Sequence, residues 1–133
     1  MITVIFEEAK EVNFLADKKY NILIADDSEM NRSILADILE NEYEILEAEN
    51  GVQALEIIET CQQSLSLVLL DIVMPELDGY GVLEAMNQKG YISDIPVIMI
   101  SSESSASCVE RTYELGVADF IGRPFDALIV RRR

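Results

Sequence analysis

Short runs of apolar residues alternate along this chain with longer segments of helical periodicity. Two of the runs, residues 22–25 and 67–70, consist of Ile, Leu, Val and Ala alone. Such runs are typical of strands buried on both faces of a parallel sheet. The longer segments place apolar residues three and four positions apart, as amphipathic helices do. The pattern therefore predicts an α/β protein in which strands and helices alternate.

Turn residues and caps divide the pattern into five strand–helix units. The predicted strands cover residues 21–27, 43–48, 67–71, 96–101 and 118–121, and the predicted helices cover 28–40, a segment from 51, 80–88, 105–115 and a segment from 124. The apolar positions expected to face the core on the first two helices are Ile34, Leu35, Ile38 and Leu39, then Val52, Leu55 and Ile58. We predict a doubly wound, five-stranded parallel sheet with helices on both faces.

Both ends of the chain depart from this repeat. Residues 1–19 precede the first strand and fit a helix and a strand equally well, so we treat them as an extension or linker. Residues 20–133 form the predicted domain. The helix that begins at Pro124 has about ten residues before the sequence stops, so we expect a truncated last helix. Either residues 1–19 or a second copy of the chain, in a homodimer, is expected to cover the sheet surface that this helix leaves open.

Three carboxylates follow the ends of two predicted strands. Asp26 and Asp27 close the first strand, and Asp71 closes the third. Ligands of open parallel sheets bind beyond the carboxyl ends of the strands. Converging carboxylates repel one another unless a cation lies between them, and hard oxygen ligands select Mg²⁺, Ca²⁺ or Mn²⁺. Taken without Asp71, the Asp26–Asp27 pair fits a helix cap equally well.

Two further strand ends bring other groups to the same edge. Ser101 closes the fourth strand with a hydroxyl, and Arg123 follows the fifth with a permanent cation. These groups and the three acids can hold a divalent metal and a phosphoryl group together. Asp71 can then act as a nucleophile and form an acyl phosphate. Each of Ser101 and Arg123, considered alone, also fits an ordinary surface position.

Composition narrows the classes of function. The net charge of −15 argues against binding to nucleic acids or anionic membranes, which need clustered Lys and Arg. No apolar run is long enough to span a membrane, and no signal peptide is evident. The chain has no His, so a His base or His metal ligand is excluded. Cys61 and Cys108 show no metal or redox spacing, which favours a cytoplasmic protein with free thiols.

Five motifs, in order and spacing, resemble the receiver domain of bacterial two-component response regulators. They are ILIADDS at 22–28, NGVQAL at 50–55, LDIVMPELDG at 70–79, PVIMISS at 96–102 and GVADFIGRPF at 116–125. The resemblance covers residues 20–133. It implies the flavodoxin-like fold of receiver domains, a three-layer α/β/α sandwich.

The resemblance also implies the parts of a phosphorylation site. Asp71 would be the phosphoacceptor. Mg²⁺ would be the cofactor, bound by Asp26, Asp27, Asp71 and the backbone carbonyl of Val73.

Three further positions match residues that respond to phosphorylation in this family. Ser101 would be the switch hydroxyl, and Phe120 would change rotamer with it. Arg123 stands where the family normally has Lys, and its planar guanidinium needs more room than an ammonium group. We expect this substitution to weaken the coupling between phosphorylation and the conformational change.

The leading functional hypothesis is a signalling switch in a phosphorelay. A sensor histidine kinase or phosphotransfer protein would phosphorylate Asp71, and the change in conformation would control an output domain or partner outside this chain. Such a domain catalyses only its own phosphorylation and dephosphorylation and is not a metabolic enzyme. One alternative is a Mg²⁺-dependent aspartyl-phosphate phosphatase, but Val73 stands where its general acid should be. Another is a docking domain that works without phosphorylation.

Overall fold

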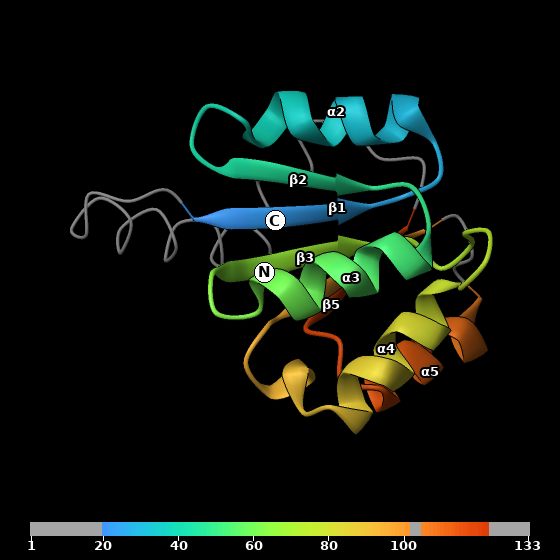
Figure 1. Cartoon of the computed structure of the whole chain (residues 1–133). Coiled ribbons are helices and arrows are strands. Elements are labelled where there is room, and N and C mark those ends of the chain that lie inside the picture. The colour runs from blue at the N-terminus through green and yellow to red at the C-terminus, as the bar shows by residue number, and fades with distance from the viewer. Residues whose placement is uncertain (1–19, 102–104, 123–133) are drawn as a thin grey trace.

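The computed structural model describes residues 20–101 and 105–122, and strands alternate with helices throughout this part (Figure 1). The elements are β1 (Asn21–Ala25), α2 (Glu29–Leu39), β2 (Glu44–Ala48), α3 (Gly51–Cys61), β3 (Leu65–Leu70), α4 (Gly79–Gln88), a 3₁₀ turn η1 (Tyr91–Ser93), β4 (Val97–Ser101), α5 (Ala106–Glu114) and β5 (Asp119–Gly122). The expectations for residues 1–19, Arg123 and the last helix lie outside the described residues.

The five strands form one parallel sheet in the order β2-β1-β3-β4-β5. This is the flavodoxin-like strand order, as predicted. The chain moves outward from β1 to β2 and then crosses back to β3 on the other side of β1. The carboxyl ends of β1 and β3 are therefore neighbours at the point where the winding reverses, which is where ligands bind in such sheets.

Helices lie on both faces of this sheet. Leu23, Val68 and Met99 point to one face, where they join a buried cluster with α3 and α4. Ile22 and Ile24 point to the opposite face, where they contact Leu35 and Leu39 of α2 and other buried residues. Successive strand residues alternate between faces, so one apolar run supplies both halves of the core. Each fully buried aliphatic side chain contributes roughly 1.5–3 kcal/mol.

Helix α5 lies beside α4 (Figure 1), and a small cluster joins the two helices. The Tyr80 hydroxyl and the Cys108 sulfur are 2.8 Å apart. The Arg111 guanidinium lies 4.0 Å from the centroid of the Tyr80 ring and 3.3 Å from a Glu84 carboxylate oxygen. Tyr80 lies in the first turn of α4, the helix that follows β3 and Asp71. Its contacts therefore join α5 to the start of this helix.

The predicted apolar stripes were wrong at two positions. Ile34 on α2 and Val52 on α3 are exposed. Leu35 and Leu39 on α2 and Ile58 on α3 are buried as predicted, and Ala54 on α3 is buried in addition. A helix contacts a sheet through only part of its circumference, and the side chains at the rim of the apolar arc stay in water.

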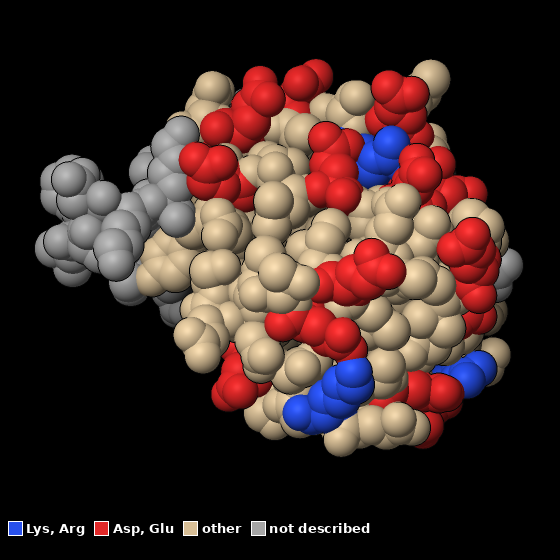
Figure 2. Space-filling view, viewed as in Figure 1, with Lys and Arg blue, Asp and Glu red and all other residues tan. Residues whose placement is uncertain are grey.

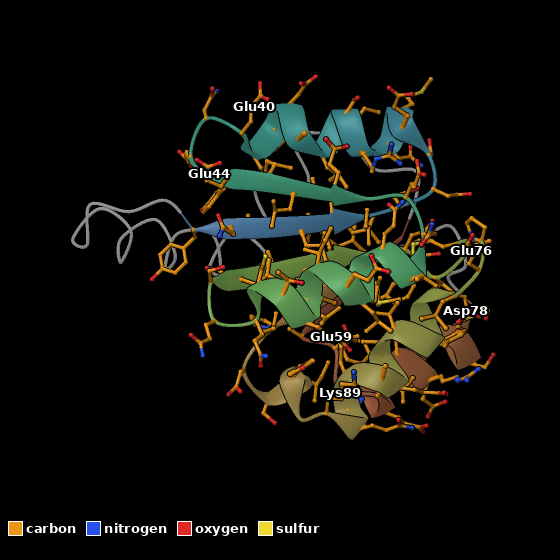
Figure 3. All side chains as sticks on the ribbon, in the orientation of Figure 1. Glu40, Glu44, Glu59, Glu76, Asp78 and Lys89 are labelled. Atoms are coloured by element: carbon orange, nitrogen blue, oxygen red, sulfur yellow. The ribbon has the colours of Figure 1, made fainter. Side chains whose placement is uncertain are left out.

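Acidic side chains are spread over the visible surface, with few basic ones between them (Figure 2). Glu40 and Glu44 mark the end of α2 and the start of the edge strand β2, and Glu59 of α3 pairs with Lys89 after α4 (Figure 3). Charges along an edge strand oppose pairing with other chains. No helix in the described part of the chain is long and apolar enough to cross a membrane.

Candidate functional site

The predicted acids Asp26, Asp27 and Asp71 meet at the carboxyl edge of the sheet. The backbone N–H of Asp71 donates to the carbonyl oxygen of Ala25 at 3.0 Å, and that of Asp26 donates to Ala48 at 3.0 Å. These bonds continue the sheet ladders past the ends of the strands. One oxygen from each of the three carboxylates lies within 4.8 Å of the others.

The three carboxylates differ in their access to water. Asp26 is 1% exposed and Asp71 7%, whereas Asp27 is exposed. Water therefore reaches the acid cluster mainly on the side of Asp27. Burying charge without compensation is costly, so a cation at this point would offset the repulsion among the acids.

The Asp26–Asp27 pair does not itself cap α2, which was the alternative left open for it. Ser28 is the N-cap of α2, and its hydroxyl accepts a hydrogen bond from the Asn31 N–H at 3.3 Å. One carboxylate oxygen of Asp26 accepts the Ser28 N–H at 2.9 Å. This bond fixes the turn between β1 and α2, so Asp26 supports the start of the helix and contributes to the acid cluster as well.

Ser101 is fully buried at the end of β4. It pairs with Gly122 of β5, and Phe120 pairs with Met99 two residues earlier. Phe120 is partly buried against the cluster formed with α3 and α4. Because β3 and β4 are parallel neighbours, Ser101 ends at the same sheet edge as Asp71. Arg123 follows Gly122 in the sequence and lies outside the described residues.

The turn after Asp71 leads from the acid cluster to α4. Ile72 and Met74 are buried, and Val73 between them is exposed. The turn is closed by the Gly79 N–H, which donates to the Ile72 carbonyl oxygen at 2.7 Å. The exposed Val73 thus belongs to the rim of the site, and no acidic side chain stands at this position.

Gly79 is needed for close packing and not for a special backbone conformation. It is the first residue of α4, and among the described glycines only Gly90 and Gly116 have positive φ. A Cβ atom at Gly79 would lie 2.4 Å from the backbone oxygen of Asp71. Glycine is needed here because the helix begins in contact with the backbone of the acid itself.

Arg32 is a site neighbour that sequence reasoning missed. Its Nη1 donates to the backbone oxygen of Asp26 at 2.7 Å, and its Nε donates to a Glu47 carboxylate oxygen at 2.9 Å. The side chain is only 12% exposed. It ties α2 to both β1 and β2 and brings a positive charge to the backbone of the acid cluster. The only signal in the sequence was an Arg one turn after the Ser28 cap, a position that usually holds a solvated cation.

The donor set fits a hard divalent cation. Carboxylate oxygens are the ligands that Mg²⁺ and Ca²⁺ prefer, and Mg²⁺ is commonly held by one or two carboxylates with waters and phosphate oxygens. The acids can therefore hold such an ion beside a bound phosphoryl group. A sheet of this strand order, with acids beyond β1 and β3 and a hydroxyl beyond β4, has the architecture of a signalling receiver domain.

Comparison with known proteins identifies the family. The sequence matches the response regulator receiver domain over residues 22–131, and the chain belongs to this family. It is therefore a domain of two-component signalling, and a phosphorylation-dependent switch is the general function of its family. The predicted family and fold are confirmed.

The relatives come from plants and bacteria. Two-component response regulator-like PRR73 of Oryza sativa subsp. indica is 35% identical over 84% of this chain and 15% of its own length. A probable cyclic di-GMP phosphodiesterase of Vibrio cholerae is 37% identical over 84% of this chain and 25% of its own length. The chain thus spans a quarter or less of these two relatives.

A solved structure confirms the fold. The CheX-CheY-BeF3-Mg²⁺ complex from Borrelia burgdorferi contains a chain that is 30% identical, with a TM-score of 0.77, over 85% of this chain and 84% of that one. The agreement in fold therefore covers most of both chains.

Proposed function

We propose that this chain is a phosphorylation switch in which Asp71 accepts a phosphoryl group. One observation carries the proposal: three carboxylates from two neighbouring strand ends have oxygens within 4.8 Å of one another. An Asp71 oxygen attacks the phosphorus of a phosphohistidine, the P–N bond breaks, and the nitrogen electron pair stays with the leaving imidazole. The product is an acyl phosphate on Asp71.

Asp26, Asp27, Asp71 and the backbone carbonyl of Val73 are the proposed ligands of Mg²⁺. The donor set supports this assignment, because the carboxylates are hard ligands and Val73 lies two residues after Asp71. When bound, the ion supplies positive charge that offsets the charge of the carboxylates and of phosphoryl oxygens. The Borrelia burgdorferi relative, whose complex contains BeF3 and Mg²⁺, supports the same chemistry.

Ser101, Phe120 and Arg123 are the proposed responders. The Ser101 hydroxyl moves toward the phosphoryl group, and Phe120 changes rotamer with it. Their pairing across β4 and β5 supports a joint movement, since Phe120 lies opposite Met99 in the same ladder as Ser101. Arg123 would pair with a phosphoryl oxygen, and this assignment rests on the sequence alone.

A sensor histidine kinase or phosphotransfer protein is the proposed donor. Large apolar side chains are exposed in the first turns of α2 and α3 and in the turn after β3, at Met30 (73%), Val52 (41%) and Val73 (56%). These positions follow the carboxyl ends of β1, β2 and β3, which is the edge of the sheet that carries the acids. Exposed apolar patches next to a reactive group suit a docking protein. We propose that this phosphoryl transfer takes place in the cytoplasm.

The alternatives fit less well. An aspartyl-phosphate phosphatase needs a general acid two residues after its nucleophile, and that residue is the exposed Val73. A docking domain that works without phosphorylation would have no need for an intact acid cluster. The chain is therefore proposed to turn over no metabolite and to catalyse only the gain and loss of its own phosphoryl group.

The decisive experiment is to incubate the protein with acetyl phosphate and Mg²⁺ and to measure its mass. We expect a gain of one phosphoryl group that disappears when Mg²⁺ is chelated and in Asp71→Asn. Asp37→Asn is the matched control, because it removes the same charge from an exposed position on α2. Labelling of Asp71→Asn at the rate of the unmodified protein would overturn the proposal.

A further inference from the structure

The first residue of α3, Gly51, lies against the turn that follows Asp71. A Cβ atom at Gly51 would lie 2.0 Å from the carbonyl oxygen of Leu77 and 2.7 Å from both its carbonyl carbon and its Cβ. Real Cβ atoms essentially never come within 3.0 Å of other heavy atoms. Because two of these atoms belong to the backbone, no rotamer change at Leu77 could make room for a side chain at Gly51.

The turn is a closed unit, so a displacement at Leu77 would reach the acid. The Leu77 N–H donates to the Pro75 carbonyl oxygen at 2.7 Å, and the Gly79 N–H donates to that of Ile72 at 2.7 Å. Glu76, between Pro75 and Leu77, has a φ of 67°. A non-glycine residue keeps this conformation only when its surroundings hold it. At Gly79 a Cβ atom would lie 2.4 Å from the backbone oxygen of Asp71, so the start of α4 lies close to the acid.

Residues 48–51, which connect β2 to α3, also contact the backbone of Asp26. The Ala48 carbonyl oxygen accepts the Asp26 N–H at 3.0 Å. Asn50 then caps α3 by accepting the Gln53 N–H at 2.8 Å. Residues 48–51 therefore contact the backbone of Asp26 on one side and the turn after Asp71 on the other.

We infer that Gly51 is a positioning residue for the Mg²⁺ site. This inference rests on the proposed function, because that function supplies the site. Its missing side chain lets the turn lie close to the end of β2, so that the Val73 carbonyl and the Asp71 carboxylate stand at a fixed distance from Asp26. A side chain at this position would move the turn outward and separate the two halves of the ligand set. Gly51 touches no ligand and acts only through the backbone of Leu77.

The test is Gly51→Ala, with Mg²⁺ titrated into the full chain and followed by amide NMR shifts. We expect Mg²⁺ affinity to fall about tenfold, the lower end of the range for residues that support metal ligands. The fold should be retained at lower stability, because the turn must move to admit the Cβ atom. Phosphorylation by acetyl phosphate should slow at limiting Mg²⁺ and recover at saturating Mg²⁺.

Two other glycines provide matched controls. A Cβ at Gly81 would lie 2.3 Å from Cδ1 and 2.9 Å from Cγ of the same Leu77, so the side chain of Leu77 and not its backbone would have to shift. A Cβ at Gly90 has nothing within 4 Å, but its φ of 76° makes the substitution a strained one. Gly81→Ala and Gly90→Ala should therefore keep the Mg²⁺ affinity of the unmodified protein, and Gly90→Ala should do so despite lower stability.

The outcomes separate this inference from the proposed function. If the unmodified protein neither binds Mg²⁺ nor becomes phosphorylated, the proposed function fails and this inference with it. If it does both and Gly51→Ala binds Mg²⁺ equally well, only the positioning role is overturned. If Gly51→Ala fails to fold, the double variant Gly51→Ala with Leu77→Gly replaces it. Glycine at position 77 gives the turn more freedom to shift. Equal Mg²⁺ affinity of that double variant and Leu77→Gly alone would likewise overturn the role.

Discussion

Asp26, Asp27 and Asp71 carry the same chemical group in three different environments. Asp26 is buried and accepts a backbone hydrogen bond from Ser28. Asp71 is nearly buried at the centre of the sheet edge, and Asp27 is exposed at the rim. Asp71, the proposed phosphoacceptor, is thus more accessible than Asp26 and less exposed than Asp27.

Asp71→Asn is expected to raise the stability of the metal-free protein. The change removes one of three negative charges whose oxygens lie within 4.8 Å. At such distances two unit charges repel by about 1 kcal/mol even in bulk water, so the free energy of unfolding should rise by at least about that amount. Urea unfolding in the presence of a chelator measures it, and Asp37→Asn on the surface should change little. Equal stability of Asp71→Asn and the unmodified protein would show that the acids do not repel one another measurably.

Tyr113 links α5 to β5, and this contact should make stability depend on alkaline pH. Its hydroxyl donates to an Asp119 carboxylate oxygen at 3.2 Å. Partial burial, and then the negative charge of Asp119, raise the pKa of Tyr113 above its ordinary value of 10.0. The folded state thus favours the neutral phenol, and this contribution is present below the unfolded pKa and lost as pH rises through the folded pKa.

Comparison with Tyr113→Phe isolates the effect. As pH rises through the unfolded pKa of about 10 and beyond it, the unfolding free energy of the unmodified protein should fall more steeply than that of the variant. Lys89 beside Glu59 has a raised pKa as well, but it is present in both proteins and cancels. Parallel curves in urea unfolding would contradict the expected role of Tyr113.

At the scale of elements, each of the four described α-helices follows a strand and begins with an N-cap residue. Ser28, Asn50, Asp78 and Ser105 each accept a hydrogen bond from the backbone N–H three residues later. The caps satisfy helix donors that would otherwise lack partners. They also fix the point at which each helix starts, and so where its first turn stands relative to the acids.

Asn50→Ala should lower the free energy of unfolding by about 1 kcal/mol, the typical effect of losing an N-cap. The lost bond is the one from the Gln53 N–H to Asn50 Oδ1, at 2.8 Å. Asn50→Asp keeps a cap oxygen and should retain most of the stability. Urea unfolding of the three proteins makes the comparison, and equal loss in both variants would mean that the cap bond itself is not the source of stability.

Across the whole molecule, the order of the strands brings distant parts of the chain into one site. Asp26 and Asp71 are far apart in sequence, and they meet because β1 and β3 are neighbours. Ser101 joins them through the pairing of β3 with β4. Binding at this edge therefore holds several strand ends together and should stabilise the fold as a unit.

Mg²⁺ and beryllium fluoride together should raise the melting temperature more than either alone. A ligand that binds only the folded state adds stability according to its concentration relative to its Kd, and the phosphoryl mimic adds oxygen- or fluoride-type ligands for the hard cation. Thermal unfolding with each addition separately and with both tests this. In Asp71→Asn the joint effect should vanish, and additive shifts in the unmodified protein would contradict coupled binding.

Much of the fold and the identities of the candidate site residues were predicted from the sequence. Buried parallel strands must be apolar throughout, so their runs and the acids that end them are visible as local patterns. The helix boundaries were equally local, because caps such as Ser28 and the closing Gly116 with its φ of 97° mark the ends. Family motifs then added the roles proposed for Ser101, Phe120 and Arg123.

Other features depended on the tertiary structure alone. Sequence pattern did not distinguish the buried Asp26 from the exposed Asp27, or the exposed Ile34 from the buried Leu35, because burial is set by what lies opposite a residue. The Arg32 contact with Asp26 and the approach of Gly51 to Leu77 join segments that are distant along the chain. Local chemistry determined which elements and which reactive groups this protein has. The packing of those elements decided which groups meet, since distances across a fold are properties of the whole arrangement and not of any one segment.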